Sequence, residues 1–243
     1  MTLTQLIAVR HGESEGNVAR EAAEAEGAEV ITIDQRDPDV PLSARGREQA
    51  EAVGRWLAGF AAREPVDAVW SSPYVRARQT AEAALAAAEQ AMPIRVDERL
   101  RDRELGVLDL LTGTGVRARF PEEAARRRWL GKLYYRPPGG ESWADVALRL
   151  RSLLADLDRQ VDGTVVVFCH DALIMLLRYV LEGLDEATLL ELARTATVAN
   201  GSVTRLVRSG DGWLLAEFDE QQHLHAEGVR PTEHPGETDD ARR

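Results

Sequence analysis

The sequence predicts an α/β fold built on a largely parallel β-sheet. Short apolar runs alternate along the chain with longer segments whose apolar residues recur at helical spacing. This alternation is typical of βαβ units, in which a helix connects one parallel strand to the next. With 243 residues, 44% of them hydrophobic, the chain is long enough to bury a substantial core.

The strand candidates differ between the body of the chain and its end. Four short runs are candidates for parallel strands: residues 6 to 9, 66 to 70, 94 to 96 and 164 to 169. A final pair of strand candidates, residues 202 to 207 and 213 to 218, is joined by the sequence SGDG, which suits a hairpin turn. The sheet should therefore end in an antiparallel hairpin.

Helical spacing identifies the segments between these strands. The predicted helices span residues 43 to 62, 74 to 91, 143 to 159 and 172 to 181. Ser43 is placed to cap the first of them. The last is apolar almost all round, so it should be buried on most sides.

Three stretches depart from this rhythm. Residues 18 to 41 predict a helix that runs into an exposed, turn-prone loop. Residues 107 to 140 contain GTG, a basic cluster and PPGG, and they predict a lid-like insertion over one end of the sheet. We expect a single domain over residues 1 to 224 and a disordered tail over residues 225 to 243, which are rich in Pro, Glu and Asp.

Composition excludes several classes of protein. The longest apolar runs, on either side of His170, fall short of the roughly 20 residues that a membrane span needs, and the N-terminus has no signal-peptide pattern. Cys169 is the single cysteine, so there is no intramolecular disulfide, and we expect a cytoplasmic protein. The net charge of −11 argues against nucleic acid as a partner and would repel an anionic substrate unless local cations reverse the field.

Polar residues stand directly after three of the predicted strands. Arg10 and His11 follow the first, and His170 follows the last parallel strand. Ser72 follows the second, where it is placed as a helix cap, with Arg76 about one turn into the helix. Ligands of open α/β sheets bind at the carboxyl ends of the strands, so neighbouring strands would bring two histidines and two arginines to one point.

Such a cluster suits phosphoryl transfer. Arginine matches the oxygens of a phosphate, and a neutral imidazole can attack phosphorus to give a covalent phosphohistidine. Fixed positive charge would stabilise the oxygens of the group being transferred. The leaving oxygen needs a proton, and Asp102 and Glu104, after the strand at residues 94 to 96, are placed to supply it.

Each of these residues, taken alone, has an ordinary explanation. Arg10 and His11 would more often be a surface or capping pair, and His170 a hydrogen-bonded core histidine. Asp102 and Glu104 alternate with arginines, as exposed ion-pair faces do. The occurrence of all these residues together favours a phosphoryl-transfer site.

These residues lie in segments that resemble the histidine phosphatase superfamily, the phosphoglycerate-mutase-like family, in its phosphatase branch. The segments are VRHGESEGN (9 to 17), PLSARGREQA (41 to 50), SSPYVRARQTA (71 to 81), LRDRELG (100 to 106), GGESWADV (139 to 146), VVVFCHDA (165 to 172) and NGSVTRL (200 to 206). The resemblance implies a three-layer α/β/α sandwich with a mostly parallel central sheet and an inserted helical lid. It also implies an enzyme without metal or other cofactor, whose partner is a small-molecule phosphate ester, and it is compatible with a homodimer.

The resemblance also implies residue roles. His11 corresponds to the nucleophile that becomes phosphorylated, and Arg10 and Arg76 to arginines that hold the phosphate. His170 corresponds to the second histidine of the site, both catalytic and phosphate-binding. Asn17 occupies a position that often contacts the phosphoryl group or the substrate.

The proton donor stays open between three carboxylates. Asp102 aligns with the family's usual glutamate but is one methylene shorter, so Glu104 remains a competitor. Asp171 follows His170 directly, as does the proton donor of the acid-phosphatase branch. We rank them Asp102, Glu104, Asp171.

The favoured function is hydrolysis of a small phosphorylated metabolite through a phosphohistidine on His11. One alternative is a 2,3-bisphosphoglycerate-dependent phosphoglycerate mutase, but its FTGW-type and ERHYG-type segments are not found here. Another is a non-catalytic phosphate-binding or interaction module, which loss of His11 would have marked. The cluster of Arg126 to Arg128, with Trp129 and Tyr134, is either a selector of a second anionic or flat apolar group or a solvated helix face.

Overall fold

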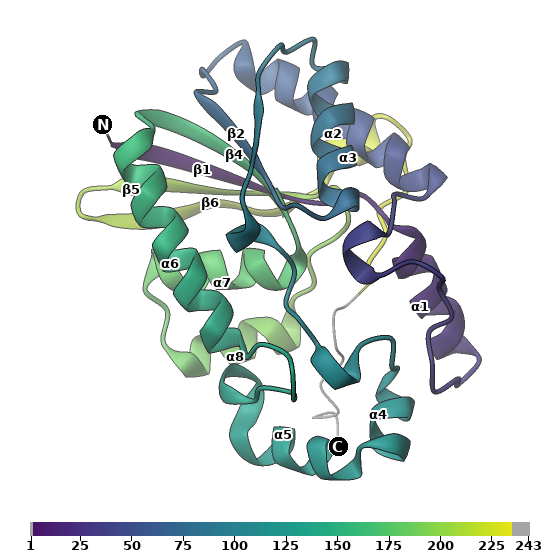
Figure 1. Cartoon of the computed structure of the whole chain (residues 1–243). Helices are drawn as coiled ribbons and strands as arrows, with labels where there is room; N and C mark the ends of the chain where they lie inside the picture. Colours follow the sequence, from purple (N-terminus) through teal and green to yellow (C-terminus); the bar gives the residue numbers. More distant parts are fainter. Residues whose placement is uncertain (1, 235–243) are drawn as a thin grey trace.

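The computed structural model describes residues 2–234, and within them one sheet runs through the centre of the molecule (Figure 1). Its strand order is β3-β2-β4-β1-β5-β6. The strands are β1 (Leu3–Arg10), β2 (Ala68–Ser71), β3 (Ile94–Val96), β4 (Gly163–Cys169), β5 (Val203–Ser209) and β6 (Gly212–Glu220). The first four are mutually parallel, whereas β5 pairs antiparallel with both β1 and β6, which confirms the mostly parallel sheet and its terminal hairpin.

Helices cover both faces of the sheet. On one face lie α2 (Ala44–Ala61) and α3 (Val75–Ala87), and on the other α6 (Trp143–Gln160) and α7 (Asp171–Glu182). Alternate residues of each central strand point to opposite faces of the sheet. Because helices cover both faces, both sets of residues are apolar. The structure is therefore the three-layer sandwich expected.

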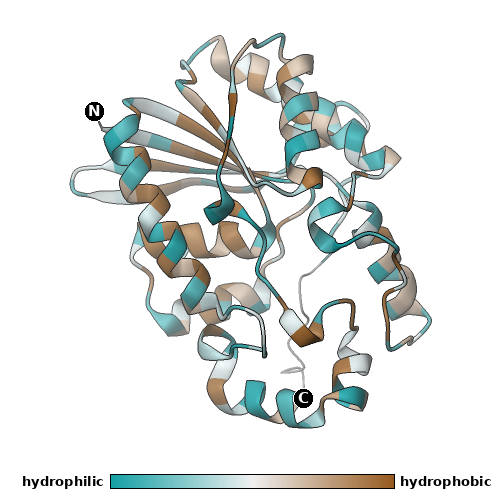
Figure 2. Cartoon of the chain, in the orientation of Figure 1, coloured by the Kyte–Doolittle hydropathy of each residue, from teal (hydrophilic) through white to brown (hydrophobic). Residues whose placement is uncertain are grey.

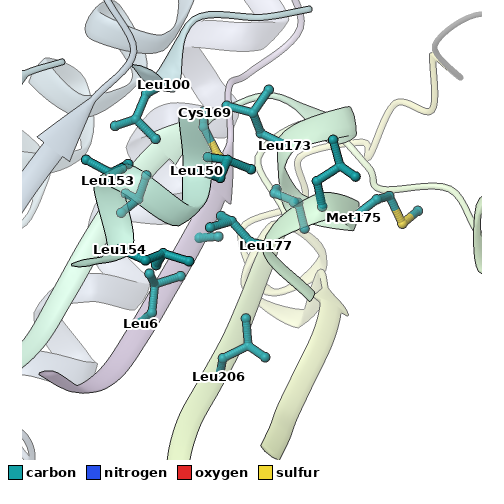
Figure 3. Close-up of a cluster of buried hydrophobic side chains, with 14 of the residues drawn as sticks. Leu6, Leu100, Leu150, Leu153, Leu154, Cys169, Leu173, Met175, Leu177 and Leu206 are labelled. Atoms are coloured by element: carbon teal, nitrogen blue, oxygen red, sulfur yellow. The ribbon is translucent and has the colours of Figure 1, made fainter. Parts of the chain in front are cut away.

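The two faces of β1 show this directly. Ile7 and Val9 pack into the cluster formed with α2 and α3, whereas Leu6 belongs to the cluster formed with α6 and α7. Figure 3 shows this second cluster, in which Leu154 of α6 lies beside Leu6 and Leu177 of α7 belongs to the same group. Burying a leucine side chain of this kind contributes about 1.5–3 kcal/mol. In Figure 2 the central strands and α7 carry much of the hydrophobic colour, whereas hydrophilic residues are frequent along α5.

A side-chain cap sets the start of α2 but not that of α3. Ser43 accepts a hydrogen bond from the Gly46 N–H at 3.0 Å, which confirms it as the cap of α2. The start of α3 differs from the prediction, because Ser72 does not cap it. The backbone at Tyr74 is still extended, so the helix begins at Val75, and the Ser72 hydroxyl instead accepts the Tyr74 N–H at 3.2 Å.

Helical segments also frame one end of the molecule. The predicted insertion contains α4 (Gly113–Arg119) and α5 (Pro121–Tyr134), and α5 lies beside α8 (Glu186–Thr195) in Figure 1. A further helix, α1 (Glu15–Ala25), follows β1 directly, and α8 was not predicted. None of the helices within residues 2–234 is long and apolar enough to cross a membrane.

The chain after β6 differs from the disordered tail expected from residue 225. It forms α9 (Gln222–Ala226) and then runs back to the sheet, where Thr232 and His234 are buried. The Asn200 N–H donates to the Thr232 carbonyl at 2.9 Å, and Gln49 donates to its hydroxyl at 3.0 Å. A Pro- and Glu-rich composition gave no sign of these long-range bonds. The rest of the expected tail, residues 235 to 243, lies outside the described residues.

Candidate active site

The strand order places the three polar strand ends side by side. In the sheet β4 lies between β1 and β2, with Arg10 in register with Cys169. His11 and His170 therefore face each other, with ring centroids 5.1 Å apart. Both are buried, at 3% and 0% exposure. The sequence prediction that these residues meet at one point agrees with this geometry.

The hydrogen bonds of His11 decide which ring nitrogen carries the proton. Its Nδ1 lies 2.7 Å from the carbonyl oxygen of Gly12. A carbonyl only accepts, so Nδ1 is the protonated nitrogen of the neutral ring and Nε2 keeps its lone pair. His11 lines the cavity described below, so this lone pair belongs to a ring that a ligand can reach.

Both imidazoles are held in the neutral form. Burial, followed by the charges of Arg76, His170 and Arg10, lowers the pKa of His11 well below its usual value of 6.5. Burial, followed by Arg76, Arg149 and Arg10, lowers the pKa of His170 in the same direction. At neutral pH His11 is therefore an uncharged imidazole beside fixed cations.

The guanidinium of Arg10 is fixed by two carbonyl groups. Its terminal nitrogens donate to the carbonyl of Val198 and, at 2.9 Å, to that of His234. Its Nε is buried and has no hydrogen-bond partner among the described residues. A buried donor without a partner is costly, so an anion that accepts from Nε would be stabilised there.

Arg76 is held by two carboxylates. It donates to the Asp37 carboxylate at 3.0 and 3.3 Å and to Oδ2 of Asp102 at 3.1 Å. Asp37 was not singled out in the sequence, and it lies in a turn-prone stretch that offered no sign of this role. A phosphoryl group that binds Arg76 would share the guanidinium with these two acids.

His170 is oriented by Ser72. Its Nε2 lies 2.9 Å from the Ser72 hydroxyl, which also accepts the Tyr74 N–H and can donate its own proton to Nε2. In that arrangement Nδ1 of His170 carries the ring hydrogen. Nδ1 is 3.3 Å from Oδ2 of Asp102, close enough for an ion pair, but it makes no hydrogen bond within the described part of the chain. It can therefore donate to a bound anion.

The three acid candidates line the same cavity but differ in their partners. Oδ1 of Asp102 accepts the Arg103 N–H at 2.8 Å. Oε1 of Glu104 accepts the phenol O–H of Tyr74 at 2.9 Å. Asp171 is the first residue of α7, and its Oδ1 accepts the next backbone N–H at 2.7 Å.

Asn17 is joined to His11 through Asn200. Its Oδ1 accepts the Ser14 N–H at 3.1 Å, closing the cap of α1, and accepts Nδ2 of Asn200 at 3.3 Å. The same Nδ2 of Asn200 donates to the backbone carbonyl of His11 at 3.0 Å. Asn200 was not named among the predicted site residues, although the segment NGSVTRL contains it.

A cavity of about 490 Å³ opens beside these groups. This is the size of pockets that bind small organic molecules, and it extends well beyond Arg10, His11 and Arg76. Apolar side chains form much of the remaining wall: Ile31, Ile33, Val40, Leu105, Trp143 and Met175.

The insertion contributes Lys132 to this wall, and not the arginine cluster that precedes it. The Lys132 ammonium lies 4.6 Å from the centroid of the Trp143 ring. Arg126 to Arg128 are not among the cavity-lining residues, and the neighbouring Trp129 is 88% exposed. Within residues 2–234 no group of three or more His, Cys, Asp or Glu side chains is placed to hold a metal ion.

Comparison with protein families identifies the family of this chain. The profile of the histidine phosphatase superfamily (branch 1) matches residues 6–221. The chain belongs to this superfamily. The segments RHGE and SSPYVR and the late strand with its histidine therefore carry the resemblance that they suggested.

Curated relatives include bifunctional enzymes of animals. The chain is 35% identical over 149 residues to 6-phosphofructo-2-kinase/fructose-2,6-bisphosphatase of Gallus gallus, covering 61% of this chain and 29% of that protein. It is 33% identical over 174 residues to the human 6-phosphofructo-2-kinase/fructose-2,6-bisphosphatase 3, covering 71% and 29%. The chain thus spans less than a third of the length of these relatives.

Solved structures match over nearly their whole length. Mycobacterial hydrolase 1 is 31% identical, with a TM-score of 0.71, covering 89% of this chain and 98% of that chain. A mycobacterial glucosyl-3-phosphoglycerate phosphatase is 29% identical, with a TM-score of 0.70, covering 89% and 99%. The same phosphatase in complex with inorganic phosphate is 29% identical, with a TM-score of 0.69, covering 90% and 99%.

Proposed function

We propose that this chain hydrolyses a small phosphorylated metabolite through a phosphohistidine on His11. The observation that carries the proposal is the state of His11: Nδ1 bonded to the Gly12 carbonyl, Nε2 with its lone pair, and two arginines adjacent. This is the arrangement that in-line attack on phosphorus requires.

In the first step Nε2 of His11 attacks phosphorus and the ester oxygen leaves. Arg10, Arg76 and Nδ1 of His170 would hold the three equatorial oxygens, whose charge grows in the transition state. Asn17 would contact the phosphoryl group or the substrate. In the second step water attacks the phosphohistidine and releases inorganic phosphate.

An acid must protonate the leaving oxygen, and it must then accept a proton from the attacking water. Asp102, Glu104 and Asp171 are the candidates, since all three line the cavity. Arg76 and His170 already neighbour the first of them, at 3.1 and 3.3 Å.

The cavity and the relatives together support an organic phosphate ester as the substrate. Its volume of about 490 Å³ leaves room for a leaving group next to the phosphoryl group. The relatives named above are a fructose-2,6-bisphosphatase and a glucosyl-3-phosphoglycerate phosphatase, and a complex of the latter holds inorganic phosphate. A phosphorylated metabolite of comparable size fits the space beside His11.

The test is a paired assay of the wild type and His11→Ala. Inorganic phosphate is measured over a panel of phosphomonoesters, and interconversion of 3- and 2-phosphoglycerate is measured with the bisphosphate primer present. We expect phosphate release that His11→Ala abolishes, with negligible interconversion. Robust interconversion would establish the mutase instead, and silence in both assays would favour the non-catalytic binding module.

A further inference from the structure

We propose that Glu104 is the acid that protonates the leaving oxygen and that Tyr74 is the residue that positions it. This inference rests on the proposed phosphatase function. It departs from the ranking based on sequence, in which Asp102 stood first.

The surroundings of Asp102 suit a fixed carboxylate. Its Oδ2 lies 3.1 Å from a terminal nitrogen of Arg76 and 3.3 Å from Nδ1 of His170, while its Oδ1 accepts the Arg103 N–H at 2.8 Å. Each oxygen therefore faces at least one nitrogen donor. A proton on Oδ2 would be directed at a guanidinium, so we assign Asp102 to holding Arg76 and His170 in place.

The surroundings of Glu104 are different. Within residues 2–234 its carboxylate accepts one hydrogen bond from a side chain, that of the neutral Tyr74 phenol, at 2.9 Å on Oε1. The residue is exposed and lines the cavity. Oε2 is thus able to carry a proton toward a bound ester without opposing a cationic donor. The Glu104 side chain is also one methylene longer than that of Asp102.

Tyr74 connects this acid to the phosphate-binding groups. It is buried, with 3% exposure, and its ring lies 4.8 Å from the guanidinium carbon of Arg76 and 5.3 Å from the centroid of His170, edge-on. Burial, followed by the charges of Asp37 and Glu104, raises the pKa of the phenol, so it remains a hydrogen-bond donor. One side chain therefore sets the distance between Glu104 and the phosphoryl group.

These roles account for every bond and proton in the reaction. The bond from Nε2 of His11 to phosphorus forms while the bond from phosphorus to the ester oxygen breaks, and the Glu104 proton moves to that oxygen. Glu104 is then a carboxylate, and it takes a proton from the water that attacks the phosphohistidine. The released alcohol, inorganic phosphate and regenerated acid complete the cycle.

The test uses the dependence of rate on the leaving group. A nitrophenolate leaves without help, whereas an alkoxide needs the proton. The value of kcat/KM, which reports the first step, is measured on p-nitrophenyl phosphate and on glycerol 2-phosphate. The variants are Glu104→Gln, Tyr74→Phe and Asp102→Asn, and the matched control is Tyr135→Phe, which removes another part-buried tyrosine-to-glutamate bond of 2.9 Å, to Glu123.

We expect Glu104→Gln and Tyr74→Phe to lower kcat/KM on the glycerol ester at least about tenfold more than on the aryl ester. Asp102→Asn should lower both to a similar extent, and Tyr135→Phe should leave both unchanged. A selective loss in Asp102→Asn, with equal losses in the other two variants, would overturn the assignment in favour of Asp102. Equal losses on both esters in every variant would also overturn it, and a wild type inactive on both esters would refute the phosphatase function itself.

Discussion

At the scale of single residues, the site brings two buried imidazoles close to two guanidinium groups. Positive neighbours and burial act in the same direction on a histidine, because both disfavour the imidazolium. The pKa of His11 and of His170 is lowered accordingly. The lowered pKa, which suits the nucleophilic role proposed for His11, therefore also has a consequence for the stability of the fold.

The free energy of unfolding should decrease as the pH falls below about 6.5, the ordinary pKa of histidine in an unfolded chain. Above that value His170 is neutral in both states and contributes no pH dependence. Below it the unfolded chain binds a proton that the folded chain cannot, until the pH reaches the lowered folded pKa. Each such histidine changes the free energy of unfolding by at most about 1.4 kcal/mol per pH unit.

Urea unfolding of the wild type and His170→Asn at pH 7.5 and pH 5.5 measures this slope. The variant should lose less stability than the wild type on going to the lower pH. The exposed His225, replaced by Asn, is the control and should leave the wild-type pH dependence intact. Equal pH dependence in the wild type and His170→Asn would contradict a neutral, buried His170.

At the scale of elements, the loop after β1 touches the start of α2 backbone to backbone. A Cβ added at Gly12 would lie 2.3 Å from the Gly46 carbonyl oxygen, and one added at Gly46 would lie 2.0 Å from the Glu13 carbonyl oxygen. Only glycine allows this approach. It fixes the loop that supplies the Gly12 carbonyl to His11.

Gly46→Ala should therefore destabilise the protein by about 1–3 kcal/mol and lower phosphate release, because the added methyl pushes the loop away from α2. Gly59, on the same helix, has open space around its Cβ position. Gly59→Ala should instead stabilise the protein by about 0.5–1 kcal/mol at unchanged activity. Both variants are measured by urea unfolding and by a phosphate-release assay. Equal changes in stability and activity in Gly46→Ala and Gly59→Ala would refute the close contact.

The insertion offers a second comparison, between residues on either side of the non-helical Gly131 in α5. Lys132 lines the cavity, whereas Arg128 is exposed and does not. Lys132→Glu should raise KM for phosphate esters, because it places a negative charge beside the anionic substrate. Arg128→Glu should leave KM unchanged. A rise in KM for Arg128→Glu, without one for Lys132→Glu, would show that the arginine cluster faces the substrate.

The sequence predicted those features of the helices and strands that depend on neighbouring residues in the chain. Strands and the cap of α2 follow from apolar runs and from Ser43 itself. The start of α3 was misplaced because Pro73 suits a first helical position, whereas the bonds of Ser72 to Tyr74 and His170 are tertiary. The helix α8 was missed although Asp185, its cap, gave a usable signal.

At the scale of the whole molecule, the end of the described chain returns to the site. Thr232 donates to the side chain of Asn200 at 3.2 Å, and Asn200 bonds the backbone of His11 at 3.0 Å. Two residues further on, the His234 carbonyl accepts from Arg10 at 2.9 Å. No local pattern announces contacts between residues as far apart as Gln49 and Thr232, 183 positions, or Arg76 and Asp37, 39 positions, so neither Thr232 nor Asp37 could be chosen from the sequence. The paired histidines and arginines could, because strand ends follow from topology.

Thr232→Val should weaken phosphate binding. It removes the hydroxyl that joins Asn200 to Gln49, so the segment that bears His234 loosens and Arg10 loses a fixed partner. Loss of one such hydrogen bond should raise the inhibition constant of inorganic phosphate roughly 2- to 10-fold. Thr232→Ser should restore the wild-type constant. An unchanged constant in Thr232→Val would separate this segment from the site.

The central claim is that His11 carries the phosphoryl group. The measurement that tests it most directly is intact-protein mass spectrometry of enzyme mixed with p-nitrophenyl phosphate and quenched in alkali, where phosphohistidine survives, followed by peptide mapping. We expect a gain of one phosphoryl group on the peptide that contains His11, and none in His11→Ala. Phosphate release without a phosphorylated enzyme, or turnover retained by His11→Ala, would contradict the mechanism.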